Sequence, residues 1–351
     1  MIIGTCGFGS TGSSAISDYL SEYEDKALVL DRVEFTWVDY CDGLIDLEHH
    51  LFHTHCRTID SIVALRRYQE RADSLINYYC DWKPEKEKLY RESVTSFLES
   101  ITMVKWPWCL RRDLSFKERL REKIFREYTI KKEIKSGLQL EEYPNRIVSY
   151  SMKPENFYES AKKHVKEILT VFGADDFTKD IVLDQPFSGN NPQAAFPFYE
   201  DPVAFVVDRD PRDLFCFART QLAGRNHFMP VNNVKDYVVY YKTLREGQPY
   251  LEENDRILRL RFEDMVYNYE ETTSRIREFL EYPENPNPKK YFDPALSIAN
   301  TQVYKRFPQF AKEVEFIEYE LKDYLFDFDN YDTPQNTKMF SEQSPLKKRN
   351  K

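Results

Sequence analysis

Short apolar runs, separated by glycine, proline and charged residues, recur along this chain. They predict buried β-strands at residues 2–3, 26–31, 181–183, 203–207 and 256–261. The run Val203–Val207 is apolar at every position, which is typical of a central strand in a parallel sheet. Between the runs, apolar residues recur at helical spacing, as in 269–280. Strands that alternate with helices predict an α/β fold of three layers with a mostly parallel central sheet.

A helical pattern dominates from about residue 50 to 180 and predicts a large helical insertion. Helices are expected at 44–55, 84–101 and 155–172, and Gly173 is placed to end the last of them. We therefore expect a single domain over residues 1–332 that carries this insertion. Residues 333–351 are polar and end in a basic cluster, which predicts a disordered tail.

The first strand leads into a loop of glycine and small hydroxyl residues, Gly7-Phe-Gly-Ser-Thr-Gly-Ser-Ser14, followed by a helical pattern. A strand, a glycine turn and a helix start present backbone N–H groups to a phosphate. The spacing is that of a P-loop, although Ser13 stands where the lysine belongs. A simple Gly/Ser turn is the alternative. The candidate phosphate-binding residues are Gly7, Gly9, Ser10, Thr11, Gly12, Ser13 and Ser14.

A second junction between a strand and a helix carries arginines. The run Val203–Val207 leads directly to Arg209 and Arg212. The carboxyl end of a strand faces the ligand crevice of an α/β sheet, and a guanidinium group matches the geometry of a phosphate. Arg209 is therefore a candidate phosphate ligand. The alternative is a surface arginine paired with Asp210 or Asp213.

Composition excludes several classes of protein. The net charge is −9, which argues against a nucleic-acid partner. Aromatic residues make up 15% of the chain, which suits a folded protein with an aromatic-lined cleft. No apolar run is long enough to span a bilayer, and no basic segment with an apolar run precedes the first strand. The six cysteines form no C-x-x-C pair. We expect a cytoplasmic protein with no transmembrane segment.

Two further clusters have competing interpretations. His49 and His53 are four residues apart and share a helix face, as zinc ligands can, but no third ligand is evident. Solvated or packing histidines are the alternative, and we expect no metal cofactor. The segment from Arg111 to Lys135 is dense in lysine and arginine. It indicates either a solvated helix face or a surface for an anionic acceptor.

Three segments together resemble the sulfotransferases that use 3′-phosphoadenosine 5′-phosphosulfate (PAPS), in particular bacterial carbohydrate-type members. The loop Gly7–Ser14 resembles the family's 5′-phosphosulfate loop. Val206–Asp213 resembles the strand-to-helix element R-[DN]-P-[RK]-D, which binds the 3′-phosphate. Leu258–Met265 and the following helix are similar to the family's xxYEDL element. The resemblance covers the first 40 residues and roughly 180 to 285.

The resemblance implies a P-loop-like nucleotide site, PAPS as co-substrate and no metal. It implies transfer of a sulfuryl group to a hydroxyl or amine of a small-molecule, carbohydrate or glycolipid acceptor. The family's base is often a glutamate just after the second strand, which implies Glu34 here, with Asp42 and His55 as weaker candidates. The alternative for Glu34 is a surface carboxylate near Arg32.

Two positions depart from the family pattern. Ser10 stands where the family usually has lysine or arginine, and Phe217 stands where many members have a serine. Another basic residue must then neutralise the donor, and the candidates are Lys153, Arg219, Lys305 and Arg306. Of these, Lys305 and Arg306 are predicted to bind the donor.

Two other functions compete with this one. A nucleotide-dependent phosphotransferase with a degenerate P-loop would need a lysine at position 13 and a Mg²⁺ carboxylate, and neither is apparent. A non-catalytic relative that only binds a nucleotide or a partner is the other alternative, since the basic residue of the loop is missing.

Overall fold

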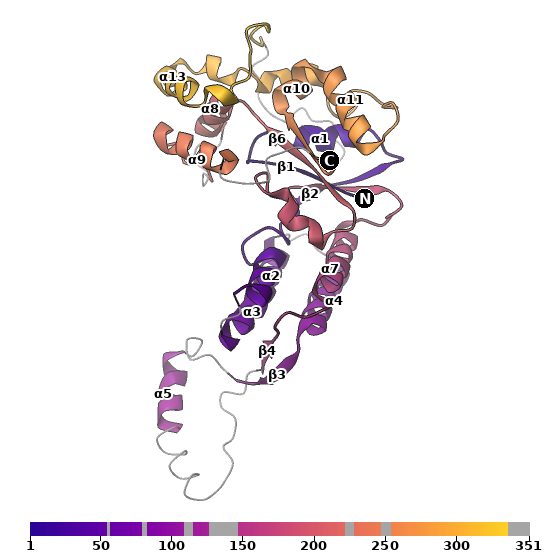
Figure 1. Cartoon of the computed structure of the whole chain (residues 1–351), viewed down its shortest axis with the longest axis vertical. Coiled ribbons are helices and arrows are strands. Elements are labelled where there is room, and N and C mark those ends of the chain that lie inside the picture. The colour runs from indigo at the N-terminus through magenta and orange to yellow at the C-terminus, as the bar shows by residue number, and fades with distance from the viewer. Residues whose placement is uncertain are drawn as a thin grey trace, which may run out of the picture. The chain divides into compact units, whose positions relative to one another are not determined.

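The computed structural model of the chain describes residues 1–54, 57–78, 83–108, 115–125, 147–221, 228–246 and 254–335. The chain divides into two compact units, drawn in Figure 1. The sheet unit comprises Met1–Asp39 and the chain from Leu169 onward, and the helical unit comprises Tyr40–Ile168. The helical unit starts and ends earlier than the predicted insertion. His55 and the tail beyond residue 335 lie outside the described residues.

The sheet unit contains five parallel strands in the order β2-β5-β1-β6-β7. Their bounds are β1 (Ile2–Gly7), β2 (Ala27–Glu34), β5 (Asp180–Asp184), β6 (Pro202–Asp208) and β7 (Ile257–Arg261). The predicted α/β class with a parallel central sheet is confirmed. β2 is longer than predicted, so that Glu34 is its last residue and does not follow it.

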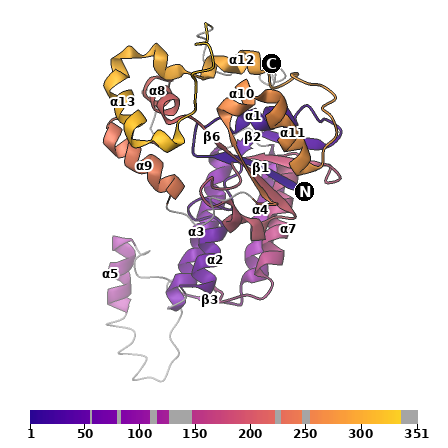
Figure 2. The same cartoon turned by 45° about the horizontal axis from the view of Figure 1, so that its top comes forward.

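One face of this sheet packs on helices α1 (Ser14–Leu20), α10 (Phe262–Tyr267) and α11 (Tyr269–Leu280). A second core joins α8 (Pro211–Gln221), α9 (Val234–Glu246) and α13 (Ala311–Glu320), which lie together in Figure 2. The remaining short elements are α12 (Pro294–Ser297), η4 (Ile298–Asn300), η5 (Val303–Arg306), η6 (Pro308–Phe310) and η7 (Lys322–Tyr324).

Between β5 and β6 the chain forms a 3₁₀ helix, η3 (Pro192–Phe198). The ring of Phe187 packs edge to face on Phe196 and Tyr199, with centroids 5.2 Å apart in both pairs. Gly4 of β1 makes room for Phe187, because a Cβ at position 4 would lie 2.2 Å from its ring. The absent side chain thus lets an aromatic cluster reach the backbone of the central strand.

The helical unit contains α2 (Leu44–Phe52), α3 (Thr58–Tyr78), α4 (Pro84–Ile101), α5 (Phe116–Phe125) and most of α7 (Phe157–Phe172). Buried His164 joins three of these helices. Its ring lies 2.7 Å from Ser93 Oγ and 2.8 Å from Tyr68 Oη. Burial lowers the pKa of His164 to about 3, so that it packs as a neutral residue. Gly173, at φ +109°, ends α7 as predicted.

A short antiparallel hairpin in this unit was not predicted. It pairs β3 (Val104–Pro107) with β4 (Ile147–Tyr150), whose strands are separated by 39 intervening positions in the numbering. Pro107 breaks the helical pattern, and it is tolerated at the end of an edge strand because it donates no ladder hydrogen bond. No helix among the described residues is both long and apolar enough to cross a membrane.

Candidate anion-binding site

The strand order reverses between β1 and β6. From β1 the chain passes through α1 to β2 at one edge of the sheet. From β6 it passes through α8 toward β7 at the opposite edge. In open α/β sheets, ligands bind outside the carboxyl ends of the strands at such a reversal. The glycine loop follows β1 and Arg209 follows β6, so that the topology brings both predicted segments to this point (Figure 1).

The glycine loop has the strand–turn–helix form that the sequence predicts. Gly9, Ser10 and Gly12 have left-handed φ values of 82°, 54° and 91°. The Phe8 N–H donates to Thr11 Oγ1 at 3.2 Å and closes the turn. A Cβ at Gly12 would lie 2.6 Å from the ring of Phe262, so that only glycine fits there without a shift.

Ser13 occupies the position of the P-loop lysine and is held from the neighbouring strand end. Gln185 Nε2 donates to Ser13 Oγ at 2.8 Å. Ser13 is buried, whereas Ser14 at the start of α1 is exposed. The loop therefore carries no basic side chain of its own, and any positive charge must come from other elements.

Arg209 supplies such a charge. Its side chain is 5% exposed, and Nη1 donates to the Ser10 carbonyl oxygen at 3.3 Å. Nη2 donates to the carbonyl oxygen of Asn300. The rings of Phe217 and Phe262 lie 5.3 and 5.4 Å from Cζ, at cation–π distance. Phe217 thus helps to hold the guanidinium beside the loop.

Arg212, the other arginine of this segment, pairs with acids as the alternative interpretation expects. It binds Asp210 at 2.8 Å and Glu318 at 2.9 Å. Asp213 is fully buried, and one of its oxygens accepts the Tyr304 N–H at 3.1 Å. Burial and the nearby Asp210 charge raise the pKa of Asp213 to about 7.

The positive charge of Arg209 acts on Arg306, which belongs to η5. Burial lowers the pKa of Arg306; Asp213 raises it, and the positive charge of Arg209 lowers it further. Its Nη2 donates to the Thr301 carbonyl at 3.2 Å, while its buried Nε and Nη1 have no hydrogen-bond partner. Two unused donors on a half-buried guanidinium favour an anionic ligand. Lys305 is exposed, and its Nζ donates to Gln302 Oε1 at 2.7 Å.

The remaining predicted residues, Arg219, Glu34, Lys153 and Asp42, belong to two different units. Arg219 donates to Asn232 Oδ1 at 2.9 Å. Lys153 and Asp42 belong to the helical unit, where Asp42 pairs with Arg67 at 2.7 Å. Glu34 is exposed at the end of the edge strand β2, opposite Asp184 of β5. It is thus about two strand spacings, roughly 10 Å, from β1.

Asp39 is a carboxylate that the sequence analysis did not single out. After β2, the Phe35 N–H donates to the carbonyl of Asp184 on β5 at 2.8 Å. Five residues after Glu34, the charge of Asp39 is close enough to raise the pKa of the Cys6 thiol on β1. Burial raises the pKa of Asp39 itself to about 7. A carboxylate directly after the largely aromatic and apolar residues Phe35, Trp37 and Val38 is the signal that marks it in the sequence.

His49 of α2 and His53, which follows the end of that helix, lie side by side. The rings of His49 and His53 have centroids 5.7 Å apart, and His53 Nε2 lies 3.2 Å from Glu48. Within the described ranges, no cluster of three or more histidine, cysteine or acidic side chains has the geometry to hold a metal ion.

A cavity of about 550 Å³ lies beside the loop residue Phe8, at the carboxyl ends of β6 and β7. Arg245 stacks on the Phe8 ring at 4.0 Å and binds Asp208 at 2.5 Å. The cavity is therefore lined by both donors and acceptors with an aromatic wall. Its lining includes Phe8, Asp208, Arg245, Arg259, Arg261 and Tyr324.

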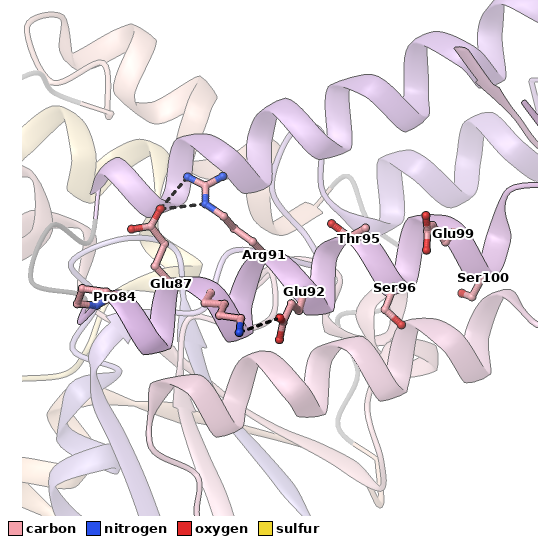
Figure 3. Close-up of a pocket in the computed structure, with 9 residues that line it drawn as sticks. Pro84, Glu87, Arg91, Glu92, Thr95, Ser96, Glu99 and Ser100 are labelled. Atoms are coloured by element: carbon pink, nitrogen blue, oxygen red, sulfur yellow. Dashed lines mark hydrogen bonds and ion pairs between the residues drawn. The ribbon is translucent and has the colours of Figure 1, made fainter. Parts of the chain in front are cut away.

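A larger groove of about 840 Å³ follows the exposed face of α4 (Figure 3). All the residues that line it belong to this one helix. Glu87 pairs with Arg91 at 2.9 Å, as Figure 3 shows, and Lys88 pairs with Glu92 at 3.7 Å. Four of its five charged residues pair with one another along the helix, and Glu99 pairs with Lys105 at 3.4 Å, so that we assign no chemistry to this groove.

No family model matches the chain, and no curated protein matches its sequence. Among solved structures, the chain is similar to the sulfotransferase STF1 of Mycobacterium tuberculosis at 12% identity and a TM-score of 0.36, covering 92% of this chain and 76% of that one. It is similar to the sulfotransferase STF9 of Mycobacterium avium at 11% identity and a TM-score of 0.37, covering 95% and 77%. The sulfotransferase domain of the curacin biosynthetic pathway gives 12% identity and 0.35, covering 92% and 97%.

Proposed function

We propose that this chain is a PAPS-dependent sulfotransferase. The observation that carries the proposal is the contact between Arg209 and the glycine loop, in which Nη1 donates to the Ser10 carbonyl at 3.3 Å. It joins the loop after β1 to the arginine after β6 at the reversal of strand order. A donor with anionic groups at both its 5′ and 3′ positions needs two adjacent anion-binding elements.

The two elements divide the donor between them. The backbone N–H groups and hydroxyls of Gly7–Ser14 would hold the 5′-phosphosulfate. Arg209 and Arg306 would hold the 3′-phosphate, with Lys305 adding charge from the surface. A phosphate oxygen would satisfy the buried Nε and Nη1 of Arg306, which have no partner. A buried donor without an acceptor costs about 1–3 kcal/mol, which gives this contact a physical basis.

The reaction requires little covalent chemistry from the protein. The acceptor oxygen or amine nitrogen attacks sulfur, the bond from sulfur to the bridging 5′-phosphate oxygen breaks, and 3′,5′-adenosine bisphosphate leaves. The acceptor proton goes to a carboxylate. The chain must position both substrates and neutralise the phosphates that accept the departing charge.

Two carboxylates compete for the role of base. The resemblance implies Glu34, which is the last residue of the edge strand β2. Asp39 raises the pKa of the Cys6 thiol on β1, and burial raises the pKa of Asp39 itself to about 7, which suits a base that works near neutral pH. We retain Glu34 as the proposal from the resemblance and Asp39 as the proposal from the fold.

The cavity beside Phe8 supports a carbohydrate or glycolipid headgroup as the acceptor. Arginine and carboxylate side chains hydrogen-bond to hydroxyl groups in both directions, and an aromatic wall packs against a sugar ring. Its volume of about 550 Å³ is in the range of small-molecule sites.

One observation favours a nucleotide-dependent phosphotransferase as the second candidate. Asp184 ends β5 beside β1, where a carboxylate can hold Mg²⁺ against a nucleotide. The position of the missing lysine, however, is filled by Ser13 and its hydrogen bond from Gln185. A non-catalytic nucleotide-binding relative would share the donor site but lack turnover.

The test is calorimetric titration of the full chain with 3′,5′-adenosine bisphosphate, ADP, and ATP with Mg²⁺. We expect the bisphosphate to bind at least about tenfold more tightly than ADP, because a charge-assisted hydrogen bond contributes roughly 1.5–3 kcal/mol. Arg209→Gln should weaken the bisphosphate about 10- to 100-fold and leave ADP less affected. Arg256→Gln, which alters an arginine at the other end of the sheet paired with Asp201, is the matched control.

Equal affinity for the bisphosphate and ADP would contradict the assignment of a 3′-phosphate site. Binding of ATP with Mg²⁺ alone would favour the phosphotransferase. If the bisphosphate binds selectively, incubation with PAPS and a panel of carbohydrates separates an enzyme from a non-catalytic relative.

A further inference from the structure

Helix α5 presents a stripe of large apolar side chains to solvent. Phe116, Leu120 and Ile124 are 81%, 51% and 61% exposed. They are spaced four residues apart, so that they lie within about 80° of arc on one face of the helix. Isolated exposed apolar residues are ordinary, but three that line up on one face of a helix mark a surface for interaction with another molecule or a membrane.

Basic residues flank this apolar stripe on both sides. At about 100° per residue, Lys117 falls on one flank and Arg119 and Lys123 fall on the other. All three are exposed. Glu118 falls on the opposite side of the helix. The stripe is therefore bordered by positive charge and separated from this negative charge.

The acid on the far side has a structural role. The Ser115 N–H donates to Glu118 Oε2 at 2.7 Å, and the Glu118 N–H donates to Ser115 Oγ at 3.3 Å. These reciprocal bonds form a capping box, which fixes the start of the helix through local contacts alone. The sequence thus specifies an amphipathic helix here without needing its apolar face to be buried within the chain.

We propose that α5 docks this protein on the surface of an anionic lipid bilayer, with its apolar stripe in the acyl boundary and its flanking cations at the headgroups. An apolar face bordered by lysine and arginine is the pattern of helices that lie in a membrane interface. The long cationic side chains reach up to the headgroups while their carbon stems cover apolar surface. The inference goes beyond the proposed sulfuryl transfer and does not depend on it.

The charges beside the stripe favour a lipid surface over a second copy of the chain or a nucleic acid. A second copy seated on the stripe would bring the flanking cations of both helices together, and like charges repel. A nucleic acid would match the cations but leave the three apolar side chains in water. The chain as a whole carries a net charge of −9, so that attraction to an anionic surface must come from a local basic element.

The test is co-sedimentation of the full chain with vesicles of phosphatidylglycerol and phosphatidylcholine, and with vesicles of phosphatidylcholine alone. We expect binding to the anionic vesicles, at least about tenfold weaker binding to neutral ones, and loss of binding in high salt. Changing Phe116, Leu120 and Ile124 together to glutamine should lower the partition coefficient by more than about tenfold. Glutamine keeps a high helix propensity, so that the helix is retained.

Two further variants complete the design. Changing Lys117, Arg119 and Lys123 to glutamine should abolish the preference for anionic vesicles. The matched control changes three exposed apolar residues of the sheet unit, Val239, Leu296 and Tyr319, to glutamine and should bind like the wild type. No binding to anionic vesicles, or undiminished binding of the stripe variant, overturns the proposal. Sedimentation as a dimer that only the stripe variant abolishes, without vesicle binding, would assign the stripe to a second copy instead.

Discussion

Replacing Glu263 by glutamine tests how the segment that carries Arg209 is held. Glu263 is fully buried at the start of α10, and its Oε1 accepts the N–H of Asp210 at 2.8 Å. Its Oε2 has no hydrogen-bond partner, and the nearest cation, Arg261 Nε, is 3.9 Å away. Glutamine keeps the oxygen that accepts from Asp210 and changes only the group that can ionise.

The magnitude follows from the pKa. Burial, with the charge of Asp210 adding to it, raises the pKa of Glu263 from 4.5 to about 8. In the unfolded chain this carboxyl ionises near pH 4.5, while in the folded chain it stays protonated until about pH 8. The folded state therefore binds more protons in this window, and the free energy of unfolding falls as pH rises. The full change corresponds to roughly 5 kcal/mol, since one pKa unit is about 1.4 kcal/mol.

The assay is urea unfolding of the wild type and Glu263→Gln at intervals from pH 5 to pH 9. We expect the difference in unfolding free energy to favour the variant increasingly as pH rises, by several kcal/mol across the window. Glu271→Gln, at an exposed position of α11, is the control and should leave the pH dependence unchanged. A difference between the wild type and Glu263→Gln that stays constant within about 0.5 kcal/mol would refute the assignment of a protonated Glu263.

Two further predictions address the loop and the base. Gly12→Ala should destabilise the chain by roughly 1–3 kcal/mol more than Gly173→Ala in urea unfolding, because both positions have positive φ but only Gly12 would bring its Cβ to 2.6 Å from Phe262. Equal losses would show that the ring moves freely. If Asp39 faces the donor, affinity for 3′,5′-adenosine bisphosphate should fall as pH rises through about 7, since its carboxylate then repels the anion. Titration calorimetry from pH 6 to 8 should show this fall in the wild type and in Glu34→Gln but not in Asp39→Asn, and its persistence in Asp39→Asn would remove Asp39 from the site. Besides Asp39, two charged groups affect the pKa of the nearby Cys6 thiol, Arg259 and Asp184. Neither Glu34→Gln nor Asp39→Asn changes these two groups.

The elements that could be predicted from sequence are those with a strong local signal. The apolar run 203–207 is a fully buried strand, and Gly12 adopts the positive φ that its position in a P-loop spacing requires. Gly173 ends α7 for the same local reason. In each case the residue type alone restricts the backbone, so that one sequence is enough to place it.

What could not be predicted depends on contacts between distant segments. The hairpin of β3 and β4 joins strands far apart in the chain, and the exposed pattern of Val104–Pro107 gives no alternation to detect. The effect of Asp39 on Cys6 of β1 depends on where the chain runs after Glu34, past the end of β5, and no single strand reveals the order of the strands in the sheet. The partner of Lys305, Gln302 Oε1, likewise follows from the left-handed turn at Gln302.

The two departures from the family pattern have a common physical explanation around one guanidinium. Ser10 leaves the loop without a cation, but its carbonyl accepts a hydrogen bond from Arg209, so that the charge reaches the loop from the end of β6. The rings of Phe217 and Phe262 lie 5.3 and 5.4 Å from the Cζ of Arg209, at cation–π distance, and contribute to holding this guanidinium. A serine at position 217 would remove one of these two rings. We therefore propose that the ring at 217 helps to hold the arginine whose charge would serve a loop that has no basic residue of its own.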